Sequence, residues 1–365
     1  MKLLESNKDF MKMRKRLLDG IYRDDPCYRD STTPLLKMLL ASSSCFASHN
    51  EQFPVIVTGN AGGPLVAAVF TIAGEMPDIL QVGFFEALPG HQEAVEMLLG
   101  RAGEIARERR LKRVVIGLDG HVNHGLGFLV DGNGSPACFG SSYNPSYYID
   151  YLQRHASSEE TLVSYFYDLT VSSMDAERSV IDRVSRRFKV RKGNFREMRG
   201  EIEIYTRLNN ACFKDHPLYS KRSMEEDYEL FRSFGPFLKE ENFLVSELAG
   251  RPVGFLLWYP DFHELVRPGG KLGLITALKY RLPWNPVSRF KMAEFGVLPE
   301  FHGSGAIAGL LSTMLEIGKE NGHSCCESGW ILESNAKSKG VAGRWADRPY
   351  KTYKVFTIDM IRSAE

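Results

Sequence analysis

A glycine-rich run in the last quarter of the chain has residue types and spacing suited to binding an anion. It extends from Met292 to Ala306 and reads MAEFGVLPEFHGSGA, an apolar strand-like segment followed by Gly303 and Gly305. An amphipathic helix is expected to begin at Gly305, and the backbone N–H groups of a first helical turn have no partners inside the helix. With the helix dipole they favour a phosphate, which can approach glycine closely. The run therefore predicts a pyrophosphate-binding loop.

A second interpretation of this run is a dinucleotide-binding turn. Gly303 to Gly309 also fits the pattern G-x-G-x-x-x-G, and Glu327 lies near the distance expected of a carboxylate that binds the ribose of NAD. Only about 55 residues follow Gly309, too few for the repeated βαβ units of a dinucleotide-binding sheet. A third interpretation is that these glycines form a turn that binds no ligand.

The same run resembles the loop with which acetyltransferases of the GNAT superfamily bind the pyrophosphate of acyl-CoA, V-x-P-x-x-[QR]-G-x-G-x-[GA]. The matching positions are Val297, Pro299, Gly303 and Gly305. His302 stands where the superfamily has Gln or Arg, and Ile307 stands where it has the last Gly or Ala.

Further segments extend the resemblance beyond the loop. Trp330–Asn335 resembles the superfamily's next strand, which ends in an Asn facing the cofactor, and Arg348–Tyr353 resembles the segment leading into its last strand. In the first half, Gly83–Glu86 and Tyr143–Tyr148 resemble a family of uncharacterised bacterial acetyltransferase-like tandem proteins. The loop position of that half lacks paired glycines, so no CoA site is expected there.

The resemblance implies an acyl-CoA co-substrate, in the simplest case acetyl-CoA, and no metal. The backbone N–H at about Val297 would polarise the thioester carbonyl. The residues implied to contact the co-substrate are Val297, His302, Gly303, Ser304, Gly305, Ala306 and Asn335.

Acyl transfer also needs a base for the amine and a proton for the departing thiolate. A carboxylate on this strand often serves as the base in the superfamily, and Glu294 is the matching residue; a structural carboxylate paired with a lysine is the alternative. The superfamily's proton-donating tyrosine is missing from the segment after Asn335, so Tyr350 is the nearest substitute. Packing of Tyr350 at the start of a strand is the competing interpretation.

Two halves of the chain show the same order of predicted elements, which indicates a tandem repeat. The elements expected in the first half lie at 1–6, 7–19, 34–41, 54–58, 65–72, 79–86, 91–111 and 113–117, followed by a glycine-rich loop at 120–140 and a Tyr-rich helical stretch at 143–151. Those of the second half lie at 188–191, 199–212, 224–234, 242–247, 253–259, 291–297, 305–322, 324–331 and 353–358.

These patterns predict an α/β (α+β) fold of two tandem GNAT-like domains, each a mixed, mostly antiparallel sheet flanked by helices. The expected domains are residues 1–175, a degenerate copy, and 186–365, the acyl-CoA-binding copy. The boundary is placed in the charged stretch from Ser172 to Arg187. An insertion from Phe262 to Pro286 is expected to form a lid or pocket wall.

Composition narrows the class of protein. The chain has 365 residues and a net charge of +1, which argues against an extended nucleic-acid surface. Six cysteines without a C-x-x-C pair indicate reduced thiols in a cytoplasmic protein, with Cys325 and Cys326 beside His323 read as buried structural thiols. No stretch approaches the roughly 18 apolar residues that a membrane span requires.

The function predicted from the sequence is a CoA-dependent N-acyltransferase that acetylates an amine of a small molecule or peptide. A non-catalytic acyl-CoA-binding or assembly protein is the first alternative, because the loop is imperfect and the tyrosine is missing. Aminoacyl transfer from charged tRNA is a third hypothesis. The acceptor and the oligomeric state are not predicted.

Overall fold

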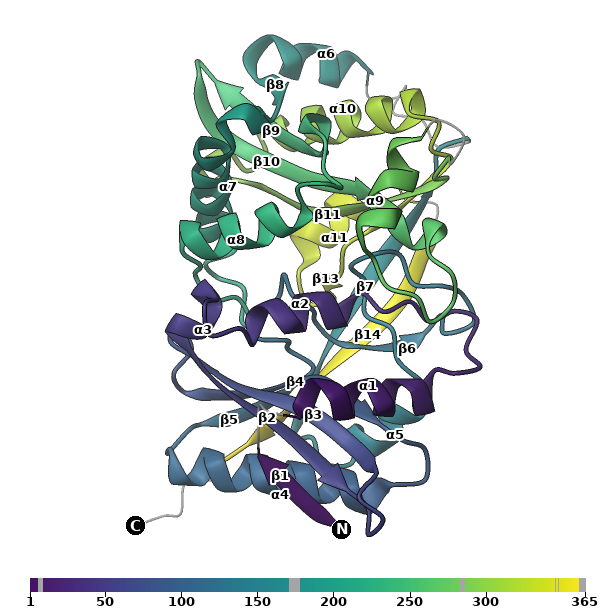
Figure 1. Cartoon of the computed structure of the whole chain (residues 1–365). Coiled ribbons are helices and arrows are strands. Elements are labelled where there is room, and N and C mark those ends of the chain that lie inside the picture. Colours follow the sequence, from purple (N-terminus) through teal and green to yellow (C-terminus); the bar gives the residue numbers. More distant parts are fainter. Residues whose placement is uncertain (6–8, 171–177, 283–285, 345, 347, 361–365) are drawn as a thin grey trace. The chain divides into compact units, whose positions relative to one another are not determined.

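The computed structural model describes residues 1–5, 9–170, 178–282, 286–344, 346 and 348–360 (Figure 1). Its chain divides into two compact units. The first contains residues 1–162, 268–271 and the described residues from Lys351 onward; the second contains 163–267 and 272–350. This division differs from the predicted domains 1–175 and 186–365, because each sheet takes a strand from the other half of the sequence.

The first unit has the strand order β1-β2-β3-β4-β5-β14, with β6 pairing with β14. Only β4 and β5 run parallel. The strands are β1 (Lys2–Glu5), β2 (Asn50–Thr58), β3 (Pro64–Ala73), β4 (Ile79–Ala87), β5 (Arg113–Ile116), β6 (Phe128–Asp131) and β14 (Arg348–Asp359). The helices are α1 (Phe10–Ile21), α2 (Thr32–Leu39), α3 (Cys45–His49), α4 (Gln92–Glu108) and α5 (Tyr147–Gln153).

Alternating side chains of β2 divide the core of this unit into two layers. Val55 and Val57 pack with α4, whereas Ile56 packs with α1 and α2 on the other face. Successive strand residues point to opposite faces, so a strand that is apolar at every position is buried on both sides. The predicted amphipathic helix is confirmed as α4, because the residues at helical spacing are its buried face.

The second unit has the strand order β7-β12-β11-β10-β9-β8, with β13 pairing with β7. Strands β11 and β12 run parallel, and the other described neighbours in this order are antiparallel. The strands are β7 (Ser158–Asp168, in this unit from Val163 onward), β8 (Lys189–Lys192), β9 (Phe243–Leu248), β10 (Arg251–Pro260), β11 (Arg289–Val297), β12 (Cys325–Ser328) and β13 (Ile331–Leu332). The α-helices are α6 (Arg178–Arg187), α7 (Met198–Cys212), α8 (Met224–Phe234), α9 (Leu274–Arg281), α10 (Ala306–Glu320) and α11 (Ala336–Gly343).

Strand β10 shows the same two-layer arrangement. Leu256 and Trp258 pack with α10, whereas Phe255 and Leu257 pack with α7 and α8. Helices therefore cover both faces of a mixed, mostly antiparallel sheet in each unit, and the predicted fold class is confirmed. Within the described residues, no helix is both long and apolar enough to cross a bilayer.

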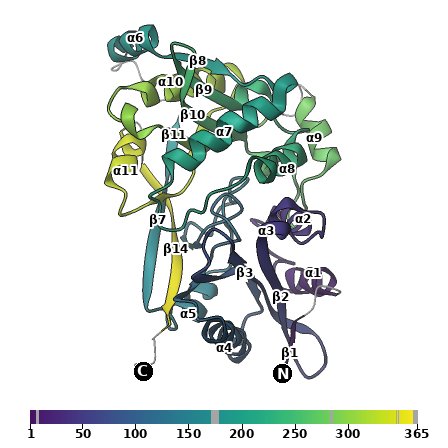
Figure 2. The ribbon, with the colours of Figure 1, turned by 90° about the vertical axis from the view of Figure 1, so that its left-hand side faces the viewer.

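The long strands β7 and β14 are the main departure from the predicted organisation (Figure 2). The second half of β7 pairs with β12, and Phe166 lies opposite Glu327. The end of β14 pairs with β5, and Phe356 lies opposite Ile116. The strand predicted at 324–331 is divided into β12 and β13. In the stretch where the boundary was placed, residues 178–187 form α6, and residues 172–177 lie outside the described residues.

Candidate active site

Strand β11 loses one of its two neighbours halfway along its length. It pairs with β10 from Phe290 to Val297, but its parallel pairing with β12 ends where Met292 lies opposite Ser328. Leu298 donates its N–H to Val253 on the β10 side at 2.9 Å. Because neighbouring strand residues alternate, Val297 directs its own N–H and carbonyl away from β10. On the side where β12 no longer pairs with it, the second half of β11 therefore exposes backbone N–H and carbonyl groups.

The glycine-rich run has the conformation of an anion-binding loop at the start of a helix. Gly303 and Gly305 have φ angles of 75° and 86°, in the left-handed region that glycine adopts most readily, and Gly305 is the residue before α10. His302 Nε2 lies 3.1 Å from the carbonyl oxygen of Val297, so this nitrogen donates. The Ser304 hydroxyl accepts a long bond from Ala306 N–H at 3.4 Å.

Helix α6 packs beside this loop. A Cβ atom added to Gly305 would lie 2.5 Å from Val184 Cγ2, so the helix leaves no room for a side chain there. Val184 is the one buried residue among those of α6, and the ring of Phe301 packs edge-on against Phe188 just after the helix. Gly303 differs, since a Cβ atom there would meet nothing within 4 Å. Gly303 is therefore the position at which the loop can be altered without disturbing packing.

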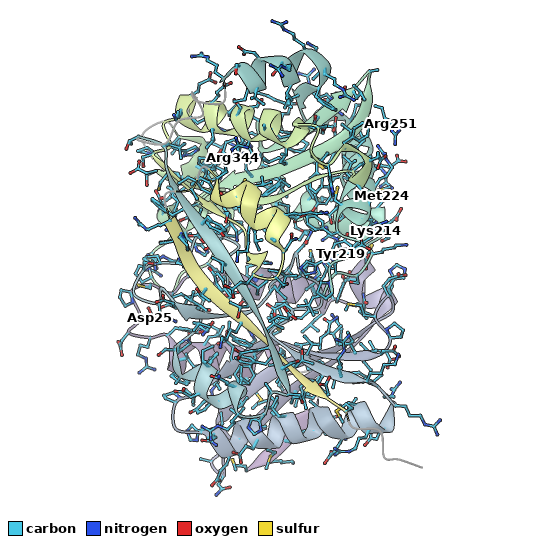
Figure 3. The ribbon with its side chains drawn as sticks, turned by 180° about the vertical axis from the view of Figure 1, so that it is seen from behind. Asp25, Lys214, Tyr219, Met224, Arg251 and Arg344 are labelled. Carbon is cyan, nitrogen blue, oxygen red and sulfur yellow. The ribbon has the colours of Figure 1, made fainter. Side chains whose placement is uncertain are left out.

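Glu294 is held by donors from α7. Its Oε2 accepts from the Tyr205 hydroxyl at 2.9 Å and from Asn209 Nδ2 at 2.5 Å. The hydroxyl of Tyr219, labelled in Figure 3, donates to Asn209 Oδ1 at 2.8 Å. In turn, Arg222 donates to the Tyr205 oxygen at 3.1 Å. Glu294 is thus oriented by a chain of polar side chains beneath the strand.

A buried ion pair supports that chain. Arg222 and Asp227 contact each other at 2.5 Å with side chains 4% and 1% exposed, and the Thr206 hydroxyl also donates to Asp227. Burial raises the pKa of Asp227 to about 6 against the opposing effect of Arg222. Burial and the charge of Glu294 raise the pKa of Tyr205 well above its ordinary value, so this phenol keeps its proton and donates to Glu294.

The other predicted site residues occupy different elements. Tyr350 is near the start of β14, with its ring 5.4 Å from that of Phe166. Asn335 is the N-cap of α11, and its Oδ1 accepts from Ser338 N–H at 3.0 Å. The structure thus brings Glu294, Val297 and the loop together on one strand and the following helix. The roles assigned to Tyr350 and Asn335 remain predictions.

Sequence reasoning missed the side chains that orient Glu294. Tyr205 and Asn209 are four residues apart in α7, and both are buried on its inner face. Polar residues at the spacing of the apolar face are the signal that could have identified them. Tyr219, Arg222 and Asp227 belong to the segment after α7 and to α8, and no local spacing indicates them.

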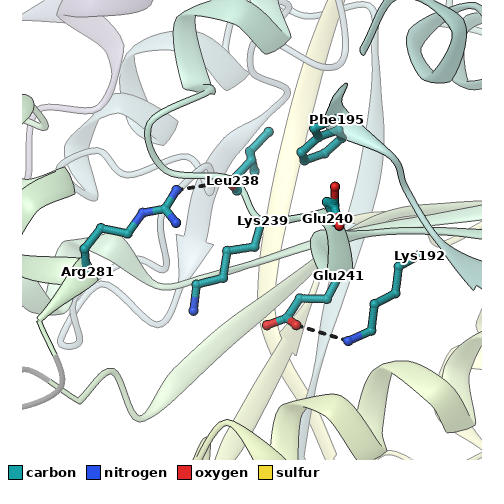
Figure 4. Close-up of a pocket in the computed structure, with 7 residues that line it drawn as sticks. All are labelled: Lys192, Phe195, Leu238, Lys239, Glu240, Glu241 and Arg281. Atoms are coloured by element: carbon teal, nitrogen blue, oxygen red, sulfur yellow. Dashed lines mark hydrogen bonds and ion pairs between the residues drawn. The ribbon is translucent and has the colours of Figure 1, made fainter. Parts of the chain in front are cut away.

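A pocket of about 390 Å³ lies elsewhere in this unit (Figure 4). It is lined by Lys192, Phe195, Leu238, Lys239, Glu240, Glu241 and Arg281. Glu241 pairs with Lys192 at 3.2 Å and accepts from Asn321, which follows the C-terminal end of α10. The pocket and the glycine loop therefore lie at opposite ends of a 15-residue helix, about 22 Å long. Within the described residues, no cluster of His, Cys, Asp or Glu could hold a metal.

The first unit has a buried glutamate in a comparable position. The parallel pairing of β4 with β5 ends at Val82, and Glu86 follows on β4. Its Oε2 accepts from Tyr22 at 2.9 Å and Tyr148 at 2.8 Å, and Arg14 lies 3.4 Å from Oε1. Burial raises the pKa of Glu86 to about 7, although Arg14 and the two phenols oppose the shift.

This glutamate predicts a pH-dependent contribution to stability. Its pKa rises from 4.5 to about 7 on folding, so its contribution is complete below pH 4.5 and is lost as pH rises through 7. Relative to Glu86→Gln, the free energy of unfolding of the wild type is expected to fall by roughly 2–3 kcal/mol between pH 5 and pH 8. Urea denaturation at both pH values measures this difference. An equal difference at both values would contradict the prediction.

Comparisons with known proteins agree with this architecture. No family model matches the chain. The bacterial ceramide synthase of Caulobacter vibrioides is 23% identical over 244 residues, and the match spans 64% of this chain and 64% of that protein. A tandem GNAT protein from the clavulanic acid biosynthesis pathway has a TM-score of 0.59 at 11% identity, covering 100% of this chain and 99% of that chain.

A GCN5-related N-acetyltransferase from Sphaerobacter thermophilus is a further structural neighbour. Its TM-score is 0.54 at 10% identity, covering 100% of this chain and 97% of that chain. The chain therefore has the fold of tandem GNAT proteins, as its sequence predicted. At these identities the likeness concerns the fold.

Proposed function

We propose that the chain is an acyltransferase that transfers an acyl group, in the simplest case acetyl, from acyl-CoA to an amine. The observation that carries the proposal is the composition of β11 and the turn after it. One stretch of backbone supplies an oriented carboxylate at Glu294, an outward-facing N–H at Val297 and a glycine-rich helix start at Gly305. These are the groups that acyl transfer from a thioester to an amine requires.

The loop and α6 are suited to binding the phosphates of acyl-CoA. The backbone N–H groups of Gly303 and Gly305 and the positive end of the α10 dipole would contact the pyrophosphate. Helix α6, which reaches the loop through Val184, contributes further positive charge. Its basic residues are Arg178, Arg183, Arg186 and Arg187.

Glu294 would act on the acceptor amine. It accepts the proton of the ammonium, the freed nitrogen lone pair attacks the thioester carbon, and the carbon–sulfur bond breaks. The N–H of Val297 would stabilise the negative charge that develops on the carbonyl oxygen. The nitrogen releases its second proton to solvent as the amide forms, and the departing thiolate takes up a proton, for which Tyr350 is the candidate donor.

A lipid amine is a second candidate for the acceptor. The match to a protein named a ceramide synthase favours it, because ceramide is the amide of a long-chain amine and a fatty acid. Thiol release should be compared for acetyl-CoA and a long-chain acyl-CoA, each with short and long-chain amines. Turnover confined to the long-chain pair would favour the lipid acceptor, and turnover confined to acetyl-CoA with a short amine would exclude it.

Two substitutions at Gly303 test acyl-CoA binding with a matched control. Both Asn and Asp tolerate the left-handed backbone conformation, and a Cβ atom at this position meets no neighbour within 4 Å. Gly303→Asp places a negative charge in the loop and should weaken acetyl-CoA binding by at least about tenfold, whereas Gly303→Asn should change it by less than about threefold.

Calorimetric titration with acetyl-CoA, and with NAD as a second ligand, measures these affinities. Binding of acetyl-CoA alone, with the expected difference between the two variants, supports the proposal. If the Asp and Asn variants bind acetyl-CoA with equal affinity, its phosphates do not bind at this loop. Binding of NAD instead would favour the dinucleotide interpretation of the same glycines.

A further inference from the structure

Helix α9 has an unusual distribution of side chains. Leu274, Ile275 and Leu278 are 81%, 74% and 64% exposed, whereas Thr276 and Ala277 are buried. A surface helix ordinarily turns its large aliphatic residues inward. These three are also the most exposed large apolar side chains among the described residues. The outward face of α9 is therefore apolar and its inward face is small or polar.

Contacts on the inner side fix this orientation. The ring of Tyr280 packs edge-on against Phe262 with centroids 5.2 Å apart, and Lys239 Nζ lies 4.9 Å from the centre of the Tyr280 ring. Arg281 donates to the carbonyl of Pro236 at 3.3 Å. The inner face of α9 is thus held against its own unit, so the aliphatic residues cannot turn inward without breaking these contacts.

Basic residues border the aliphatic face. At 100° per residue, Leu274, Leu278 and Ile275 form a stripe of about 100°, with Arg281 beyond one border and Lys279 beyond the other. Between Val266 and Leu282 the sequence has four basic residues and no acidic one. Long basic side chains beside an apolar stripe suit the boundary between anionic head groups and acyl chains.

We infer that α9 is a docking face for the surface of an anionic lipid bilayer. Leu274, Ile275 and Leu278 enter the acyl-chain boundary, while Arg267 and Lys279 contact the negatively charged head groups and Arg281 keeps its bond to the carbonyl of Pro236. A second protein would need an acidic rim around an apolar groove to match the same face, whereas an anionic bilayer offers both features without a specific fold. Docking would bring the enzyme to a lipid amine, and this consequence rests on the proposed function. The docking itself is independent of that function.

Co-sedimentation with vesicles tests this inference. The wild type should bind vesicles of phosphatidylcholine with about one third phosphatidylglycerol more tightly than vesicles of phosphatidylcholine alone. The triple variant Leu274→Ser, Ile275→Ser, Leu278→Ser should lose at least about tenfold in partitioning. Because the three positions are exposed, the variant is expected to fold as the wild type does, and far-ultraviolet circular dichroism checks this.

Two further variants separate apolar from electrostatic contributions. The control Met97→Ser removes an exposed apolar side chain from α4 and should bind vesicles as the wild type does. The variant Arg267→Gln, Lys279→Gln should lose the preference for anionic vesicles. Acetyl-CoA affinity, measured separately by calorimetry, should be the same in all variants, so a failure of docking is distinguishable from a failure of the proposed function.

Three outcomes would overturn the inference. The first is a wild type that does not bind the anionic vesicles, and the second is a triple variant that binds them equally well. The third is a wild-type dimer in light scattering that the triple variant abolishes, which would assign this face to a second copy of the chain.

Discussion

Glu294→Gln is expected to lower kcat for acyl transfer at least about 100-fold while leaving the affinity for acetyl-CoA within about twofold of the wild type. Glutamine keeps the size of the side chain and can still accept from Tyr205 and Asn209 through its carbonyl oxygen, but it cannot take a proton from an ammonium. The measurement is steady-state thiol release with an amine that the wild type accepts, together with calorimetric binding of acetyl-CoA. A large change in kcat with unchanged binding is the pattern of a proton-transfer residue.

Glu300→Gln provides the control for this variant. Glu300 lies in the turn between β11 and the glycine loop. Its Oε1 is 3.3 Å from Arg251 Nη2, and both side chains are more than half exposed. Because exposed ion pairs contribute little, this substitution should leave kcat within about twofold of the wild type. If Glu294→Gln keeps full activity, the glutamate is a structural carboxylate, and the base must be found elsewhere. If the wild type and both variants bind acetyl-CoA but acetylate no amine of a broad panel, the result favours a non-catalytic acyl-CoA-binding protein.

The sequence predicted those site residues that lie in one continuous segment of the chain. A strand, a turn with two glycines and an amphipathic helix follow one another from Arg289 to Glu320, so local spacing is enough to predict them. The backbone angles of Gly303 and Gly305 agree with the glycine requirement inferred from the pattern. The same local logic predicted α4 and the hairpin of β9 and β10.

The residues around Glu294 could not be predicted in this way. Tyr205 and Asn209 reach it from 89 and 85 positions earlier in the sequence, and Arg222 acts through Tyr205. Such contacts depend on how a helix is placed on a sheet, which hydrophobic periodicity does not specify. Polar residues on the inner face of α7 were the only local sign of the network.

Strand exchange explains why the predicted domain boundaries differ from the compact units. The second half of β7 pairs with β12 and the end of β14 pairs with β5, and in each case the partners come from opposite halves of the chain. Local sequence indicates that a segment is a strand but not which strand it joins. The charged stretch in which the boundary was placed contains α6, and Val184 is the one buried residue of that helix, so its apolar face is too narrow to be recognised from the sequence.

Arg222→Met is expected to lower the free energy of unfolding by about 3–5 kcal/mol, because it leaves the Asp227 carboxylate buried without its cation. Methionine retains much of the aliphatic volume, so the loss reports the charge rather than a cavity. The positive charge of Arg222 lowers the pKa of Asp227 and so opposes the effect of burial. Without Arg222, the pKa of Asp227 should therefore rise further. A carboxyl whose pKa is raised on folding contributes stability at low pH that is lost as pH rises, so the variant should be closer to the wild type at pH 5 than at pH 8.

Urea denaturation at the two pH values measures both effects. Arg199→Met is the matched control, since Arg199 lies 4.0 Å from Glu225 with both side chains more than half exposed, and it should change the free energy of unfolding by less than about 1 kcal/mol. Adding Asp227→Leu to Arg222→Met should recover part of the loss, because an apolar pair avoids burying a lone charge. If Arg222→Met is as stable as Arg199→Met at pH 8, the prediction that the buried Arg222–Asp227 pair stabilises the fold is contradicted.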